Sequence, residues 1–219
     1  IHTQTPLSIS VINSGLNAPW GICVLPDGRF LISEKSGKLL ILTASGGVDK
    51  QVTGLPAVVN EGQGGLLDVN IDPDFSTTRM IFWDYAEKTS GGNLLAVAKG
   101  KLSADETKIE NIQVIYRAQP AYNGTLQYGS RILFDKQGNL FVSTGERSGA
   151  DIRVKAQDLG AAIGKILHLT KDGAAVAGGP FASTANALPE IYAYGFRNPE
   201  GMAWNPNGEL WEAEFGPRG

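Results

Sequence analysis

Two segments near the C-terminal end of the sequence carry polar side chains beside glycine and proline, directly after strand-like runs. Residues 194–199 read YGFRNP and residues 214–219 read EFGPRG. In the first segment, the planar guanidinium of Arg197 can bind a carboxylate through two parallel hydrogen bonds, and the amide of Asn198 offers a donor and an acceptor. The structural alternative is a solvated arginine and an asparagine that caps the turn before Pro199. Ligand binding and a plain turn both fit this pattern.

The composition restricts the class of protein. Glycine makes up 28 of the 219 residues, whereas about 7% is usual, and this excess predicts many tight turns in an all-β fold. The net charge is −3 without a basic block, so no nucleic-acid partner is expected. The single cysteine excludes an intrachain disulfide, and neither histidine has a second one at zinc-ligand spacing. No apolar run approaches the roughly 18 residues of a membrane helix, so no membrane insertion is expected.

Hairpin-like stretches repeat along the chain. In each, an apolar run ends at a turn glycine and a second apolar run begins at once. The clearest copies are residues 21–34, 131–143 and 201–211, and a looser copy covers 67–83. Their spacing gives a unit of about 50 residues, which favours a β-propeller of four-stranded blades. A β-sandwich with similar hairpins is the alternative. Helical signal is confined to a turn or two within 156–163, and 172–187 is predicted to be a long loop between strands.

An ordered succession of motifs runs nearly from end to end. The motifs are APWGI at 18–22, PDGR at 26–29, GQGGLLDV at 62–69, DPDF at 72–75, YGSR at 128–131, GER at 145–147, AQDL at 156–159 and GKIL at 164–167. With the two C-terminal segments, they resemble the PQQ-dependent aldose sugar dehydrogenases, the soluble glucose/sorbosone dehydrogenase-like proteins. The resemblance implies a six-bladed quinoprotein propeller with PQQ over its axis beside a Ca²⁺ ion. It also implies oxidation of an aldose at C1 to the lactone, with electrons passed to an external acceptor.

The resemblance also assigns site residues. Arg197 and Asn198 match an Arg-Asn pair that contacts PQQ, and Gln63 matches a glutamine that faces substrate and cofactor. Gly216 and Pro217 match positions whose backbone carbonyls bind Ca²⁺, a hard cation that takes such oxygens readily. For Gln63, Gly216 and Pro217, an ordinary turn is the alternative.

The position of the general base departs from the family pattern. The family has a histidine directly before the aromatic-Gly-Ser-Arg stretch, whereas this chain has Gln127 before Tyr128. A glutamine amide can hold a substrate hydroxyl but cannot accept a proton near neutral pH. General-base catalysis contributes about 10²–10⁴-fold, so a weakened or lost activity is expected. Phe196 and Phe215 also stand where histidine is common, which predicts a more apolar rim.

The length of the chain is the second departure. At about 50 residues per blade, 219 residues supply four blades and part of another, fewer than six. Residues 1–219 are therefore expected to be a single propeller domain or a propeller fragment, with unpaired blade edges that favour self-association. Two other readings stay open. One is a non-catalytic binding module, or a fragment completed by a partner chain. The other is a lactonase that uses Ca²⁺ alone, held by Asp68, Glu146 and Glu214. No signal peptide is visible, and a periplasmic or secreted location follows from the resemblance alone.

Overall fold

The repeated hairpins form the first two strands of separate antiparallel sheets in the computed structural model, which describes residues 5–216. Their turns depend on glycines with positive φ: Gly28 at +85°, Gly138 at +82° and Gly208 at +82°. A side chain with a Cβ is disfavoured in that conformation, so these positions end one apolar run and start the next. The looser copy is also a hairpin, with a short helix inserted between its strands.

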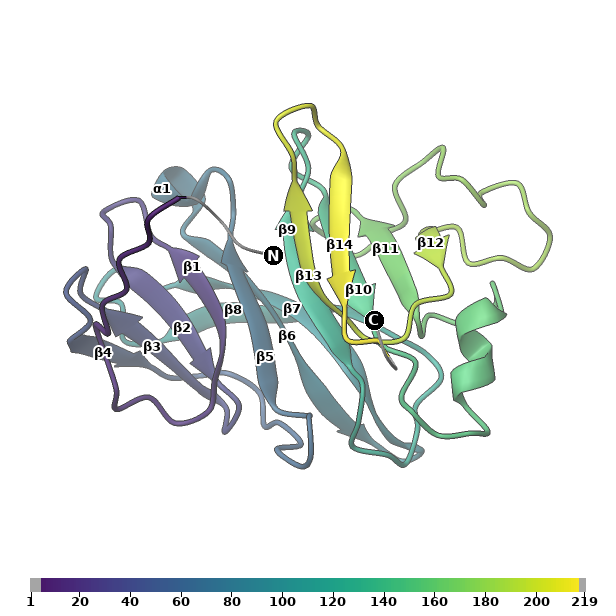
Figure 1. Cartoon of the computed structure of the whole chain (residues 1–219), viewed down its shortest axis with the longest axis horizontal. Coiled ribbons are helices and arrows are strands. Elements are labelled where there is room, and N and C mark those ends of the chain that lie inside the picture. Colours follow the sequence, from purple (N-terminus) through teal and green to yellow (C-terminus); the bar gives the residue numbers. More distant parts are fainter. Residues whose placement is uncertain (1–4, 217–219) are drawn as a thin grey trace.

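The chain forms three four-stranded sheets and one two-stranded sheet, each with neighbouring strands in chain order (Figure 1). The first sheet contains β1 (Pro19–Val24), β2 (Phe30–Glu34), β3 (Lys38–Leu42) and β4 (Val48–Val52). The second contains β5 (Leu66–Ile71), β6 (Met80–Thr89), β7 (Gly92–Leu102) and β8 (Ile109–Arg117). The third contains β9 (Gly129–Phe134), β10 (Leu140–Thr144), β11 (Lys165–Leu169) and β12 (Ile191–Tyr194). The two-stranded sheet contains β13 (Pro199–Trp204) and β14 (Leu210–Glu214), and the helices are α1 (Phe75–Thr78) and the 3₁₀-helix η1 (Arg153–Gln157).

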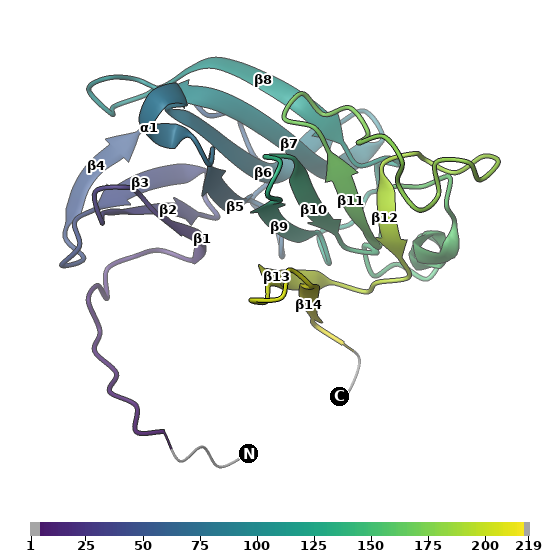
Figure 2. The same cartoon turned by 90° about the horizontal axis from the view of Figure 1, so that it is seen from above.

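The first strand of each sheet faces the first strand of the next. Contacts join β1 to β5, β5 to β9 and β9 to β13, and the sheets follow an open arc around these inner strands (Figure 2). This radial arrangement of antiparallel sheets is that of a β-propeller, so the all-β propeller prediction is confirmed.

The predicted number of blades is too high. Residues 5–216 supply three four-stranded sheets and two strands of another, not four and part of a fifth. The reason is the length of two connections within the third sheet, 145–164 between β10 and β11 and 170–190 between β11 and β12. The second of these is the long loop that the sequence predicts. The helical signal at 156–163 corresponds to η1, which begins and ends earlier than expected.

Apolar side chains fill the spaces between the sheets. One cluster includes Leu31, Ile41 and Trp83 and lies between the first and second sheets. Another lies between the second and third, where the rings of Phe82 and Phe134 meet edge to face with centroids 5.2 Å apart. Burial of these faces fixes the angle between neighbouring sheets, and so fixes the loops at their ends.

One residue from each inner strand meets at the axis. Arg131 of β9 forms an ion pair of 2.7 Å with Asp68 of β5, and donates to the carbonyl oxygen of Glu200 of β13. Its guanidinium carbon lies 5.0 Å from the ring centroid of Trp20 of β1. A single side chain therefore connects all four sheets.

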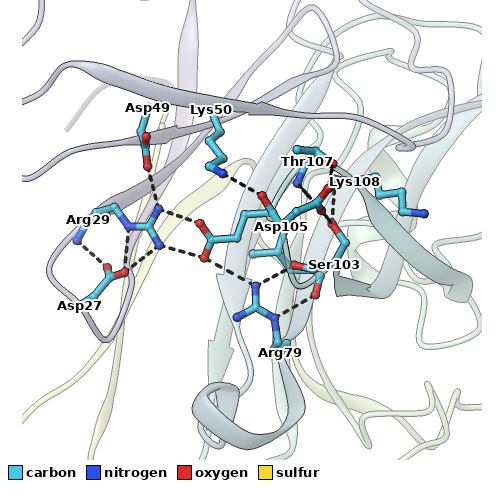
Figure 3. Close-up of polar contacts among 11 residues, drawn as sticks. Asp27, Arg29, Asp49, Lys50, Arg79, Ser103, Asp105, Thr107 and Lys108 are labelled. Carbon is cyan, nitrogen blue, oxygen red and sulfur yellow. Dashed lines mark hydrogen bonds and ion pairs between the residues drawn. The ribbon is translucent and has the colours of Figure 1, made fainter.

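A second polar cluster joins the first two sheets (Figure 3). Arg29 donates two hydrogen bonds of 2.8 Å to the carboxylate of Glu106, and pairs with Asp27 and Asp49. Arg79 lies 3.5 Å from the same glutamate. Asp27 and Arg29 follow β1, Glu106 follows β7, Arg79 directly precedes β6, and Asp49 lies in β4. The cluster therefore lies at the end of the sheets opposite the loops that lead into β5, β9 and β13.

Candidate active site

The loops that lead into β5, β9 and β13 lie together at one end of the sheets, here called the entry end. Gln63 precedes β5, Gln127 precedes β9, and Asn198 precedes β13. The backbone N–H of Gln127 donates to Oε1 of Gln63 at 2.6 Å, and that of Gly129 donates to Oδ1 of Asn198 at 2.9 Å. Three residues that the sequence assigns to the site thus belong to one hydrogen-bonded set.

Two glycines allow these loops to approach each other. Gly62 has φ +56°, and a Cβ there would lie 2.6 Å from the carbonyl oxygen of Thr125. A Cβ on Gly145 would lie 2.2 Å from the carbonyl oxygen of Gln127. Because neither contact is sterically allowed, both positions require glycine. The GQGG and GER motifs are therefore explained by close packing of backbone at the entry end.

Two buried polar atoms in the segments around Gln127 and Glu146 have no hydrogen-bond partner within residues 5–216. They are Oε1 of Gln127, whose residue is 3% exposed, and Oε2 of Glu146, whose residue is 6% exposed. Burial raises the pKa of Glu146. Glu146 is tied to the same loops, since its backbone N–H donates to the carbonyl oxygen of Arg197 at 2.8 Å. Buried polar atoms are rarely left unpaired, so this pair marks a place where a ligand can complete the hydrogen bonding.

Four non-glycine residues here adopt positive φ: Gln127 (+49°), Ser130 (+87°), Arg147 (+68°) and Ser148 (+67°). Such conformations cost free energy for residues with a Cβ, and they persist where surrounding contacts hold them. Their concentration in the segments around Gln127 and Glu146 is typical of a functional site.

Arg147 is a buried residue of the candidate site that the sequence did not single out. It is 2% exposed, and its guanidinium carbon lies 3.9 Å from the ring centroid of Tyr128. No carboxylate pairs with it within the described residues; its guanidinium donates to oxygen atoms of Asn93, Gly124 and Leu126. Its own backbone N–H donates to the carbonyl oxygen of Gln127 at 3.2 Å. Arg147 therefore holds the loop that carries Gln127.

Arg197 and Asn198 differ in how many of their side-chain hydrogen-bonding groups remain unpaired. Arg197 donates one hydrogen bond of 2.6 Å from its guanidinium to the carbonyl oxygen of Phe215, and its Nε and second terminal nitrogen make none among residues 5–216. The amide of buried Asn198 is engaged at both atoms, with Gly129 and with Oε1 of Glu200. Arg197 can thus still donate to an anionic ligand, whereas Asn198 fixes the loops.

The segment after β14 closes this side of the site. The backbone N–H of Phe215 donates to the carbonyl oxygen of Asn198 at 3.0 Å, and Gly216 follows it; Pro217 lies outside the described residues. Phe215 is 60% exposed, whereas Phe196 packs in a buried cluster with Ile166 and Met202. Of the two predicted apolar substitutions at the rim, only Phe215 presents an open apolar surface.

The alternative of a Ca²⁺-dependent lactonase requires a cluster of metal-binding side chains, which residues 5–216 do not form. Within residues 5–216, no group of three or more His, Cys, Asp and Glu side chains could hold a metal ion. Asp68 is paired with Arg131, and Glu214 accepts the backbone N–H of Arg197 at 2.6 Å. The two carboxylates are therefore engaged in holding the fold.

The fold and the site together define a β-propeller protein whose candidate site lies over the inner strands. The family model described as Glucose / Sorbosone dehydrogenase matches residues 16–219. The chain belongs to this family, as its motifs predicted.

Similar proteins cover nearly all of this chain, but the chain covers only part of each. It is 38% identical to the aldose sugar dehydrogenase YliI of Escherichia coli (strain K12), over 97% of this chain and 57% of that protein. It is 25% identical to quinoprotein glucose dehydrogenase B of Acinetobacter calcoaceticus, over 94% of this chain and 48% of that one. The chain thus spans about half the length of these relatives.

Solved structures agree with this assignment. The soluble aldose sugar dehydrogenase of Escherichia coli in its apo form aligns with a TM-score of 0.89 and 38% identity, covering 96% of this chain and 60% of that one. The PQQ-bound aldose sugar dehydrogenase of Streptomyces coelicolor aligns with a TM-score of 0.79 and 27% identity, covering 95% and 59%. In the part of the chain that the structure describes, no helix is both long and apolar enough to span a membrane.

Proposed function

We propose that this chain carries part of the active site of a PQQ- and Ca²⁺-dependent dehydrogenase that oxidises aldose sugars at C1 to the lactone. The observation that carries the proposal is the pair of unpartnered buried oxygens, Oε1 of Gln127 and Oε2 of Glu146, beside Arg197. Membership of the family and the likeness to a PQQ-bound relative support it.

The residues at the entry end fit the cofactor by their chemistry. The unused donors of Arg197 suit a carboxylate or quinone oxygen of PQQ, and Gln63 lies beside Gln127, where substrate and cofactor would meet. Asn198 would act by holding the loop on which Arg197 stands. Backbone carbonyls of Gly216 and Pro217 are the proposed Ca²⁺ ligands. PQQ, when bound, supplies the quinone carbonyl carbon that accepts hydride from C1.

Gln127 limits the proposed activity. Its Oε1 can accept a hydrogen bond from the C1 hydroxyl, which would place the sugar. It cannot remove the hydroxyl proton, so turnover should fall by about 10²–10⁴-fold relative to a histidine enzyme. A propeller that binds ligand without turnover is the second candidate function, and Gln127 is the observation that favours it.

The remaining assignments are part of the same proposal. We place residues 1–219 in a single propeller domain, or in a fragment completed by further blades or by a partner chain. Among residues 5–216, β14 pairs only with β13, so its outer edge is open to such a strand or to self-association. An external electron acceptor and a periplasmic or secreted location are inferred from the family.

Titration of PQQ into the purified chain, with and without Ca²⁺, tests the proposal through absorbance and tryptophan fluorescence. Saturable, Ca²⁺-dependent binding that Arg197→Gln weakens is the expected result. Lys136→Gln, which removes one positive charge at an exposed lysine of the β9–β10 turn, far from the entry end, serves as the matched control. Absence of binding by the native chain would reject its part in a PQQ site.

A further inference from the structure

A polar pocket of about 790 Å³ lies at the entry end, beside the candidate active site. Its walls are the loop before β5, the hairpin between β6 and β7, and Asn123 of the loop before β9. This volume falls within the roughly 300–1,000 Å³ typical of small-ligand sites. The candidate site residues Gln63 and Gln127 are not in its lining.

The polar side chains that line the pocket are unusually free. Six of them make no side-chain hydrogen bond or ion pair within residues 5–216: Asn60, Glu61, Lys88, Thr89, Ser90 and Asn123. Elsewhere at the surface, charged side chains are largely paired, as Arg29 is with Glu106 and Arg117 with Glu87. The pocket thus gathers donors and acceptors that the fold itself leaves unused.

One of the pocket's polar groups is held in place by hydrogen bonds, and another is buried without a partner. Oδ1 of Asn93 accepts hydrogen bonds from the hydroxyl of Tyr128 at 2.5 Å and from the guanidinium of Arg147 at 2.6 Å. This orients an amide that is 6% exposed, and its Nδ2 makes no hydrogen bond among the described residues. The hydroxyl of Thr89 is buried and has no partner there. An oriented donor and an unpaired hydroxyl in one wall indicate that a ligand completes them.

The chemistry of the lining selects a class of ligand. Glu61 and Lys88 supply one charge of each sign, and the other lining side chains named above are amides and hydroxyls. This set offers no net charge to attract an ion and little apolar surface for a hydrophobic molecule. It suits a neutral ligand whose groups both donate and accept hydrogen bonds, as the hydroxyls of a sugar do.

The pocket and the candidate active site share their walls. The backbone N–H of Gln63 donates to the carbonyl oxygen of Thr125 at 2.7 Å, which joins the loops before β5 and β9. Asn93 and Tyr122 exchange backbone hydrogen bonds of 3.0 and 2.9 Å, which ties the β6–β7 hairpin to the same loop. A chain of linked sugar units could therefore run from one site to the other over these loops.

We propose that this pocket is a second saccharide-binding subsite, which holds the distal units of an oligosaccharide whose reducing-end aldose occupies the candidate active site. The inference rests on the proposed function for the identity of the reducing-end site. The residues that line the pocket lie between Val58 and Asn123.

Calorimetric titration of the 219-residue chain with glucose, maltotriose and cellotriose tests the subsite directly. We expect at least one trisaccharide to bind about tenfold or more tightly than glucose. Thr89→Val and Lys88→Met should remove most of that advantage and leave glucose binding unchanged. Lys101→Met, at an exposed and unpaired lysine at the far end of β7, should change neither.

The outcomes separate the two proposals. Equal affinity for glucose and both trisaccharides, absence of sugar binding, or a trisaccharide advantage that survives both pocket variants would overturn the subsite. Trisaccharide binding that depends on Thr89 and Lys88 would support it even if PQQ fails to bind, in which case only the proposed redox function falls. Thermal unfolding of each variant verifies that the fold is intact.

Discussion

The backbone N–H of Gln127 donates a 2.6 Å hydrogen bond to Oε1 of Gln63, a residue 64 positions earlier in the chain. The bond joins the loops before β5 and β9, so neither residue can move without the other. Gln63→Ala should leave this part-buried N–H unpaired and lower the free energy of unfolding by about 1–2 kcal/mol. Gln63→Glu retains an oxygen acceptor and should keep more of the stability. Urea denaturation measures both; equal losses for the two variants would contradict this role.

Restoring a base at position 127 should restore turnover. Gln127→His provides a group whose ordinary pKa is about 6.5, and it should raise dye-linked glucose oxidation by about 10²–10⁴-fold with PQQ and Ca²⁺ present. The gain should appear as pH rises through that pKa, because only the neutral imidazole accepts a proton. Gln127→Asn, which offers no base, is the control. A pH-independent gain, or none while PQQ still binds, would show that the site no longer supports the chemistry.

Replacing Arg147 should loosen the loop that carries Gln127. Arg147→Met removes the guanidinium hydrogen bonds to three oxygen-bearing residues and should cost about 3 kcal/mol or more of unfolding free energy. Arg147→Lys keeps the charge but lacks the planar fork, so it should recover only part of the loss. Hydrogen exchange of amides in 122–128 should accelerate in both.

The exposed Arg153 provides the comparison for Arg147. Arg153→Met should change stability by less than about 0.5 kcal/mol and leave exchange in 122–128 unchanged. Full recovery by Arg147→Lys would mean that charge alone, without fork geometry, orders the loop.

The Arg29–Glu106 pair should stabilise the contact between the first two sheets in a pH-dependent way. Hydrogen bonding from Arg29 lowers the pKa of Glu106 below its ordinary value of 4.5. The stabilising contribution of the Arg29–Glu106 pair is therefore fully present above pH 4.5. It is lost as pH falls through the lower pKa that Glu106 has in the folded state. Unfolding of the native chain, Arg29→Ala, Glu106→Gln and the double variant at pH 7 and pH 3 measures the coupling. A coupling energy that is equal at both pH values would contradict the assignment.

Asp84 should make the protein less stable as pH rises. Burial and the nearby charge of Asp68 raise the pKa of Asp84 well above its ordinary value of 3.8. The folded state then binds more protons than the unfolded state above that value, so unfolding free energy falls with increasing pH until the folded pKa is passed. Asp84→Asn should reduce this decline and become relatively more stable at pH 8 than at pH 5. Parallel stability profiles for the two proteins would argue against it.

The hairpins and the family were predictable because their signals are local. A turn glycine such as Gly138 fixes φ within its own hairpin, and motifs such as YGSR occupy consecutive positions. The number of blades was not predictable from the hairpin period, since the long connections at 145–164 and 170–190 carry no repeat. Arg147 was also missed, because its partners are backbone oxygens, the side-chain oxygen of Asn93 and an aromatic ring that only the folded chain brings together. The pocket was not predictable either, because its unpaired polar side chains come from three separate segments of the chain.

The position of Arg131 at the axis has a consequence for how the chain reaches its native state. Its partners Asp68 and Glu200 lie 63 residues before it and 69 after it, so both contacts are long-range. During synthesis, Asp68 has no partner until β9 of the third sheet has been made. Arg131 in turn cannot contact Glu200 until β13 has been made. Contacts of such sequence separation form slowly. We therefore expect the sheets to form in order from the N-terminus, and the contacts of Arg131 at the axis to form last. A nascent chain released before this step would expose the unpaired carboxylate of Asp68 at the axis, where chaperones could bind.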